Sequence, residues 1–239
     1  MRVTNQRSPR LKRLATALIA LVSFVLLFLW YIGVFGGNIH AVYPGKVYRS
    51  AQLTGRNLDD VLKDDHIHTV INLRGGSPSN AWYRSETTSC KEYGADHVDI
   101  DMSARLLPAP SRLNELLQTF DHARYPVLFH CQAGSDRSGL VGALYLNVYQ
   151  HVPLHQAEAE ELTWRYGHFS FGQTHAMDDF YRLYDKTSNG LDLRDWIVKR
   201  YPALYAQLPS NEKQSDTSPM PPHRSHLAAR TGAGPSAHS

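Results

Sequence analysis

Residues 130–139, with the sequence HCQAGSDRSG, decide how the rest of this 239-residue chain is organised. An apolar run at 127–129 precedes them and a second apolar run at 139–146 follows them, which predicts a buried strand, a tight loop and a helix. In such a segment the backbone N–H groups of the loop and of the first helical turn point at one spot, where the positive end of the helix dipole also lies. The pattern therefore predicts an anion-binding pocket.

Cys131 opens this loop and Arg137 closes it, with five residues between them. A thiol beside a guanidinium at a helix N-terminus is stabilised as the thiolate, which is the nucleophilic form. Arginine adds a planar fork that binds two oxygens of a phosphate at once. Taken singly, the cysteine is typical of a buried core thiol and the arginine of a surface charge. Their shared loop and their spacing favour a site in which both face one phosphate.

The same stretch contains His130, Gly134 and the hydroxyl of Ser138. Together these residues match the signature His-Cys-x5-Arg-Ser/Thr, so the chain resembles the cysteine-dependent protein tyrosine phosphatases. YRSAQL at 48–53 and TVINLRGG at 69–76 resemble the opening of the atypical dual-specificity branch of bacteria, plants and fungi. The resemblance is to bacterial members of that branch. It implies hydrolysis of phosphate monoesters by a protein-tyrosine or dual-specificity phosphatase.

This resemblance also implies a mechanism that uses no metal and no cofactor. The Cys131 thiolate attacks phosphorus and forms a phosphocysteine, which water then hydrolyses. Loop N–H groups and Arg137 neutralise charge on the phosphate oxygens. His130 orients the loop and helps to keep the thiolate, and Ser138 hydrogen-bonds the sulfur and helps its departure. The expected phosphate-binding residues are Gln132, Ala133, Gly134, Ser135, Asp136 and Arg137.

The proton donor for the leaving oxygen has three candidates. Asp101 is the first choice, because it ends a predicted strand thirty residues before Cys131, a separation close to that in compact family members. Asp99 on the same strand is the reserve. Asp136 competes, because some bacterial relatives carry Asp-Arg in this loop, where the aspartate donates the proton or fixes the arginine. For each candidate the alternative is a solvated surface carboxylate.

The remaining pattern predicts one α/β domain at 37–208. Strands that alternate with helices favour a three-layer sandwich around a mostly parallel sheet, with the ligand at the carboxyl ends of the strands. The predicted strands are 46–50, 67–73, 97–101 and 126–129, and the predicted helices are 57–63, 81–93, 111–120, 155–166, 175–184 and 191–201. Residues 209–239 are rich in Pro, Ser, His and Gly, which predicts a disordered tail.

The N-terminus predicts a membrane anchor. Residues 1–13 are basic, and 14–36 are uncharged and apolar enough to cross a bilayer, which takes about 20 residues. The basic residues before this span place the N-terminus in the cytoplasm and the domain outside, on the periplasmic side of a bacterial inner membrane. The alternative is a cleaved signal peptide, which is less well matched by the length of the apolar run.

Three further residues each keep two interpretations. Arg49 and Arg74 stand at predicted strand ends, where they either line the rim of the pocket or pair with acids and hold loops. Cys90 is expected to be a core thiol, with a reversible disulfide to Cys131 as the alternative. With these two cysteines alone, no disulfide framework or metal site of cysteines can form.

The expected partner is a phosphorylated protein or peptide. The formal net charge of +3 gives no reason to expect nucleic acid. An acid in the loop, Asp136, argues against inositol polyphosphates and pyrophosphates, because polyanions need added positive charge. A phospholipid head group is the second substrate class and rests on the expected anchor alone. A pseudophosphatase that binds phosphorylated partners without turnover is the alternative of a different class.

Overall fold

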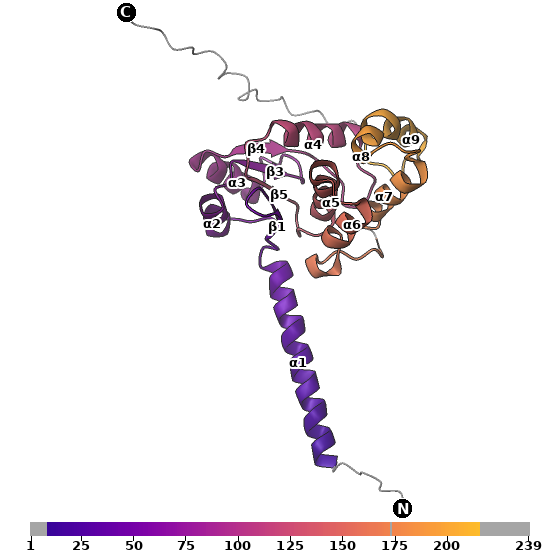
Figure 1. Ribbon diagram of the computed structural model, residues 1–239. Helices are drawn as coiled ribbons and strands as arrows, with labels where there is room; N and C mark the ends of the chain where they lie inside the picture. Colours follow the sequence, from indigo (N-terminus) through magenta and orange to yellow (C-terminus); the bar gives the residue numbers. More distant parts are fainter. Residues whose placement is uncertain (1–8, 173, 216–239) are drawn as a thin grey trace, which may run out of the picture.

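The computed structural model describes residues 9–172 and 174–215, and these contain a five-stranded mixed sheet (Figure 1). The strands are β1 (His40–Tyr43), β2 (Val47–Ser50), β3 (Thr69–Asn72), β4 (Asp96–Asp99) and β5 (Val127–His130). Their order across the sheet is β1-β2-β5-β3-β4. The edge strand β1 is antiparallel to β2, and the other neighbours are parallel. The strand that leads into residues 131–139 is therefore central.

The strand register brings three strand ends to one level. His130 at the end of β5 is paired with Ser50 of β2 on one side and with Asn72 of β3 on the other. All four residues of β3 and of β5 are buried. A parallel strand that is covered on both faces has this continuous apolar composition. The loop after β5 therefore begins with a neighbouring strand end on each side of it.

Helices cover both faces of the sheet. On one face, α2 (Arg56–Asp64) and α3 (Ala81–Glu92) pack on Val70 and Leu128. The other face carries Ile71 and Phe129, which point into a larger core, as strand periodicity requires. The helices that contribute to this larger core include α4 (Pro110–His122), α5 (Asp136–Gln150), α6 (Leu154–Glu161), α7 (Ala176–Thr187), α8 (Leu193–Asp195), η2 (Trp196–Arg200) and α9 (Tyr201–Gln207).

Two glycines of α5 let α6 approach it closely. A Cβ at Gly142 would lie 2.2 Å from Glu161 Oε2, and a Cβ at Gly139 would lie 2.7 Å from Leu162 Cδ2. No side chain fits at these positions without displacing the neighbouring segment. The end of α6 is thereby held against the helix that follows the loop.

The helix α1 (Pro9–Phe35) covers the apolar stretch for which we expected a membrane span. Crossing a membrane takes one helix of about 20 mostly apolar residues. Among the helices in the described part of the chain, none is both long and apolar enough for this. The expected transmembrane helix at 14–36 is therefore wrong, and so are the membrane partner and the single-pass location with an extracytoplasmic domain that we derived from it.

The C-terminal end of the described chain lies against the domain. Residues 209–215, which composition had grouped with the tail, contact the segment that follows β4. The Leu107 N–H donates to the Glu212 carbonyl at 2.9 Å, and the Gln214 N–H donates to the Leu107 carbonyl at 3.1 Å. The rest of the expected tail, 216–239, and the first eight residues of the basic N-terminus lie outside the described residues.

Candidate active site

The backbone carbonyl groups of the loop between β5 and α5 accept hydrogen bonds from residues outside the loop. The four successive acceptors are the carbonyls of Gln132 (from the Gln52 N–H, 3.2 Å), Ala133 (from Asn38 Nδ2, 3.0 Å), Gly134 (from Arg49 Nη2, 2.6 Å) and Ser135 (from Arg49 Nη2, 3.0 Å). The N–H groups of 132–135 have no acceptor within the described part of the chain. A row of N–H groups left without a protein acceptor beside a helix N-terminus is suited to bind an anion.

Gly134 is required by the shape of this loop. Its φ is +69°, and a Cβ there would lie 2.6 Å from the Ala51 nitrogen and 2.7 Å from the Ser50 carbonyl carbon. A positive φ disfavours any side chain, and backbone atoms so close cannot be moved aside cheaply. The loop therefore packs directly on the end of β2.

Cys131 and Arg137 occupy the start and the end of the loop. Cys131 is buried and its thiol is free. Arg137, in the first turn of α5, donates through Nη1 to the carbonyls of Leu73 and Met102, at 3.1 Å each. Its Nε is buried and has no partner within the described residues. A buried guanidinium N–H without an acceptor is a donor available to a ligand.

Ser138 lies one residue further along α5. Its hydroxyl is buried and is 3.5 Å from the carbonyl oxygen of Ser50, which is at the limit of a hydrogen bond.

Arg49, a residue of β2, supports the loop between β5 and α5. Its side chain is fully buried, and besides the two loop carbonyls it contacts Glu161 at the end of α6. Arg49 Nη1 is 2.5 Å from Glu161 Oε2 and 2.8 Å from the Glu161 carbonyl oxygen. Burial raises the pKa of Glu161, and the Arg49 charge opposes this shift. Of the two interpretations of Arg49, the structure shows the pairing with an acid.

A second buried acid contacts the histidine of the loop. Glu86 on α3 has Oε2 3.0 Å from His130 Nε2 and Oε1 2.7 Å from His97 Nε2. Gln52 also donates to Oε2. Burial would raise the pKa of Glu86, but the hydrogen bonds from His130 and His97 outweigh it and hold the pKa well below its ordinary value. His130 is thus held by a carboxylate on α3, which packs on the opposite face of the sheet from α5.

Arg74 lies at the carboxyl end of β3, near the loop. Its Nη1 donates to Gln52 Oε1 at 3.0 Å, and its guanidinium lies 3.9 Å from the centroid of the Trp82 ring. Burial and the neighbouring charge of Arg137 lower the pKa of Arg74, and the charges of Glu86 and Cys131 oppose the shift. Arg74 therefore adds a second positive charge beside the loop that contains Cys131 and Arg137.

Two of the three candidate acids have both carboxylate oxygens engaged. Asp99 accepts from Asn72 Nδ2 at 2.7 Å through Oδ1 and from the Tyr83 hydroxyl at 2.5 Å through Oδ2. Asp136 has Oδ1 2.7 Å from His168 Nδ1, and Oδ2 accepts from Ser135 Oγ at 3.2 Å. Both carboxylates serve to hold neighbouring segments.

Asp101 differs from these two. Its carboxylate makes no hydrogen bond or ion pair within the described residues, and the residue is half-buried. It lies against Gly75, whose φ of +76° and close approach (2.8 Å between a built Cβ and Asp101 Cβ) leave no room for a side chain. The next residue, Met102, gives its carbonyl to Arg137 at 3.1 Å. Asp101 therefore stands beside the arginine of the loop with its carboxylate uncommitted.

His168 is the partner of Asp136. Its side chain is buried, and its Nε2 is 3.1 Å from Asp178 Oδ2 on α7. Burial would lower the pKa of His168, but the bonds to Asp136 and Asp178 raise it from 6.5 to about 9. An imidazolium between two carboxylates therefore ties the first residue of α5 to α7.

The predicted site residues come together around the loop, and their supports lie far away in the sequence. The residues of 130–138 converge at the carboxyl end of β5, and Asp101 joins them through the contact of Met102 with Arg137. Sequence reasoning missed Glu86, Glu161 and His168, because each lies in a separate element with no motif of its own. Cys90 and Cys131 are both free thiols.

An anion cradle at the carboxyl end of a central parallel strand, opened by a cysteine and closed by an arginine, is typical of cysteine-dependent phosphatases. The family model described as the tyrosine phosphatase family matches residues 35–153, which contain all five strands and α5. The chain belongs to this family, and the membership supports phosphatase activity.

Several solved structures of phosphatases match part of this chain. TpbA from P. aeruginosa is 22% identical, with 62% of this chain and 84% of that chain covered and a TM-score of 0.49. The core catalytic domain of the PP-IP phosphatase SIW14 from S. cerevisiae is 18% identical, with 63% and 93% covered and a TM-score of 0.49. PTPMT1 is 16% identical, with 63% and 98% covered and a TM-score of 0.45.

Proposed function

We propose that this protein hydrolyses phosphate monoesters through a phosphocysteine intermediate, as a protein-tyrosine or dual-specificity phosphatase. The observation that carries the proposal is the orientation of the loop. Its carbonyls are bound from outside, its N–H groups at 132–135 have no protein acceptor among the described residues, and Arg137 Nε is buried beside them without a partner. These donors surround a position that suits a phosphoryl group.

In the first step the Cys131 thiolate attacks phosphorus in line. The bond from phosphorus to the leaving oxygen breaks, and a bond from phosphorus to sulfur forms. The loop N–H groups at 132–136 and the Arg137 guanidinium stabilise the charge on the equatorial oxygens. His130, held by Glu86, orients the start of the loop, and Ser138 assists the departure of the sulfur when water attacks the phosphocysteine.

Asp101 is the proposed general acid. It gives a proton to the leaving oxygen in the first step, and its carboxylate takes a proton from the attacking water in the second. The support for this choice is that Asp101 has an uncommitted carboxylate next to Arg137, whereas the carboxylates of Asp99 and Asp136 are engaged by Tyr83 and His168. We assign Asp99 and Asp136 to positioning rather than to proton transfer.

Phosphotyrosine in a protein or peptide is the proposed substrate. The loop carries one cation, Arg137, and no lysine, which matches a single phosphoryl group better than a polyphosphate. A phospholipid head group had been favoured by the expected membrane anchor alone, and that support is gone.

The deciding experiment compares the hydrolysis of a phosphotyrosine peptide, a phosphoserine peptide and phosphatidylglycerol phosphate. We expect the phosphotyrosine peptide to be turned over fastest and the variant Cys131→Ser to be inactive while it still binds the peptide. Asp101→Asn should slow substrates with poor leaving groups most and flatten one limb of the pH–rate profile. Asp136→Asn should leave the dependence on the leaving group unchanged.

Two results would overturn this assignment. A wild-type protein that binds phosphotyrosine peptide but turns over none of the substrates would be a pseudophosphatase. An Asp136→Asn variant that loses the leaving-group dependence while Asp101→Asn keeps it would move the acid into the loop.

A further inference from the structure

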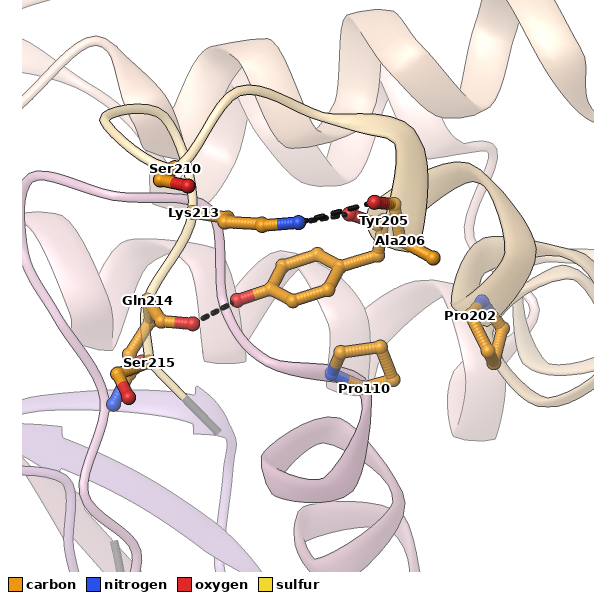
Figure 2. A pocket seen from close by; sticks show the side chains of 8 residues that line it. All are labelled: Pro110, Pro202, Tyr205, Ala206, Ser210, Lys213, Gln214 and Ser215. Carbon is orange, nitrogen blue, oxygen red and sulfur yellow. Dashed lines mark hydrogen bonds between the residues drawn. The ribbon is translucent and has the colours of Figure 1, made fainter. Parts of the chain in front are cut away.

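Residues 209–215, the C-terminal segment, lie on the loop that carries the proposed general acid. Figure 2 shows this segment beside α9, with Lys213 and Gln214 next to Tyr205. Leu107, at the far end of the acid loop (101–107), forms a parallel bridge with Lys213 and exchanges backbone bonds with both neighbours of that residue. The segment therefore runs beside the acid loop and is paired with it at one isolated β-bridge.

Gln214 contacts the acid loop with its side chain as well. Its Nε2 donates to the Asp101 carbonyl at 2.7 Å, and its Oε1 accepts from the Ser103 N–H at 3.0 Å. The side chain is buried, and both ends of its amide are used. The residue between these two, Met102, gives its carbonyl to Arg137 on the opposite side. Gln214 thus fixes the backbone on both sides of the peptide that the phosphate-binding arginine holds.

The segment is itself anchored on α9. The Tyr205 hydroxyl donates to the Gln214 carbonyl, and Lys213 Nζ donates to the carbonyls of Tyr205 (3.2 Å) and Ala206 (3.1 Å). A cavity remains between the segment and α9, with Pro110, Pro202 and Ser210 in its wall (Figure 2). Hydrogen bonds with Asp101, Ser103 and Tyr205 hold Gln214 at the edge of this cavity.

The acid loop is held between two contacts that come from different parts of the chain. On the side of the sheet, the Met102 N–H donates to the Leu73 carbonyl at 3.3 Å, and Gly75 abuts Asp101. On the far side, the described contacts of the 101–103 backbone are those with Gln214. Loss of the amide would leave a part-buried carbonyl and a part-buried N–H without these partners, and the loop would shift to reach water.

We propose that Gln214 is a positioning residue that sets the place of Asp101 relative to the scissile bond, so that the C-terminal segment is a functional part of the catalytic domain. The proposal rests on the proposed function, with Asp101 as the acid. The segment lies outside residues 35–153, which match the family. It acts on the proton-donating step and leaves the anion cradle unchanged.

The test replaces Gln214 by Met, which keeps the length of the side chain and removes both hydrogen bonds. Glu212→Gln is the matched control, because the Glu212 side chain is exposed and only its carbonyl meets the acid loop. The substrates are phenyl phosphate, whose leaving group needs a proton, and 2,4-dinitrophenyl phosphate, whose leaving group does not. Alkylation of Cys131 by iodoacetate reports whether the cradle is intact.

We expect Gln214→Met to lower kcat/KM for phenyl phosphate, which reports only the step that forms the phosphocysteine, by about 10- to 100-fold, since a displacement of about 1 Å can cost 100-fold. The kcat/KM for 2,4-dinitrophenyl phosphate and the alkylation rate should stay within about 2-fold of wild type, a margin far below the 100-fold to 10,000-fold that general acid catalysis supplies. In an Asp101→Asn background the Gln214→Met change should have no further effect on phenyl phosphate.

Different results separate the two proposals. If Asp101→Asn selectively slows phenyl phosphate and Gln214→Met does not, the positioning role of Gln214 is wrong and the acid assignment stands. If Asp101→Asn itself shows no such selectivity, the proposed function fails at its acid. Equal losses with both substrates, together with slower alkylation, would show that Gln214 supports the whole fold and would overturn the positioning role. The variant Gln214→Glu, which keeps the acceptor for Ser103 and loses the donor to Asp101, should show the same selective loss.

Discussion

His168 Nδ1 lies 2.7 Å from Asp136 Oδ1, so the residue that begins α5 is bound to an imidazole placed thirty-two positions further along the chain. The same ring contacts Asp178 on α7 at 3.1 Å. Asp136 therefore serves as one end of a charged link between two helices. This contact explains how a carboxylate is accommodated beside the proposed anion-binding loop, because the adjacent imidazolium compensates its charge.

The His168 link should make stability depend on pH. Its pKa is raised from 6.5 to about 9 in the folded protein, so the stabilisation is complete below about pH 6.5 and is lost as the pH rises through 9. We expect His168→Gln to lower the free energy of unfolding at pH 6 by about 1.5 to 3 kcal/mol, the range for hydrogen bonds to charged groups. The variant should also lose the decline between pH 6.5 and 9. Denaturant unfolding across this range measures both effects.

The exposed histidine–aspartate pair His175–Asp179 on α7 offers the matched control. His175→Gln should leave the free energy of unfolding within about 1 kcal/mol of wild type, as for other exposed pairs. A His168→Gln variant that keeps the wild-type decline above pH 6.5 would show that the link does not set this pH dependence.

The buried Arg49–Glu161 pair should be indispensable to the loop. Arg49→Met removes the donors to the Gly134 and Ser135 carbonyls and leaves Glu161 buried without its partner. We expect a loss of about 3 to 5 kcal/mol in the free energy of unfolding. Phosphatase activity should fall even where the variant remains folded. Thermal unfolding and kcat/KM, compared at a temperature at which the variant is folded, provide the measurements.

Lys199→Met, which breaks the exposed pair with Asp195, controls for the loss of a charge. It should cost less than about 1 kcal/mol and leave kcat/KM unchanged. Equal effects of the Arg49 and Lys199 substitutions would refute the bracing role of Arg49.

Gly134 should tolerate no side chain, because an added Cβ would clash with the backbone of β2. Gly45, which has a similar φ but open space around it, serves as the control. Gly134→Ala combines a positive φ with contacts of 2.6 and 2.7 Å to the backbone of Ala51 and Ser50. Gly45→Ala has φ +73° and nothing within 4 Å of the added Cβ. Both changes should cost about 1 to 2 kcal/mol for the backbone conformation. Only Gly134→Ala should cost about 1 to 3 kcal/mol more and abolish activity.

Thermal unfolding and a phosphate-ester assay of the two alanine variants distinguish these terms. Full activity in Gly134→Ala would mean that the loop can move off the end of β2 without harm to the cradle.

We expect both the stability and the activity of the protein to depend on ionised Glu86. Hydrogen bonds from His130 and His97 overcome burial and depress the pKa of Glu86 below its ordinary 4.5. The stabilisation it provides is therefore present above about pH 4.5 and is lost as the pH falls through the lower folded value. Glu86→Gln should be less stable than wild type at pH 7, and the difference should shrink in acid. It should also lower kcat, because His130 loses the group that orients it.

Unfolding curves from pH 7 down to pH 2 and the rate with a phosphotyrosine peptide test this. Glu160→Gln, at an exposed position on α6 where the carboxylate accepts from Gln156 at 2.8 Å, is a control that should change neither quantity greatly. A Glu86→Gln variant with wild-type kcat would show that the orientation of His130 by Glu86 is not needed for activity.

The part of the site that could be predicted from the sequence is local. The strand, loop and helix around 130–139 follow from apolar runs and spacing within about twenty residues, and the family match lies over them. The predicted strand at 97–101 is shorter in the structure, since β4 ends at Asp99. Asp101 consequently lies in a loop rather than at a strand end, and its neighbours, more than its own element, determine its place.

The supports of the site could not be predicted, because they depend on long-range contacts. Glu161 contacts Arg49 at a separation of 112 positions in the sequence, and Gln214 contacts Asp101 at a separation of 113. Neither Glu161 nor Gln214 belongs to a recognisable motif. The short edge strand β1 was missed because four residues with alternating exposure carry little periodic pattern. The membrane span was predicted from a run of apolar residues, and no described helix supports it.

The central place of β5 divides the control of this site between two flanks. The flank of β2 shapes the cradle through Arg49 and Gly134, whereas the flank of β3 and β4 contributes Arg74 and Asp101. Transfer of the β3 and β4 flank, which carries the proposed general acid, into a related domain would therefore need two segments. Residues 73–107 would have to be transferred together with 209–215, because the backbone of Asp101 and Ser103 would otherwise lose its hydrogen bonds with Gln214.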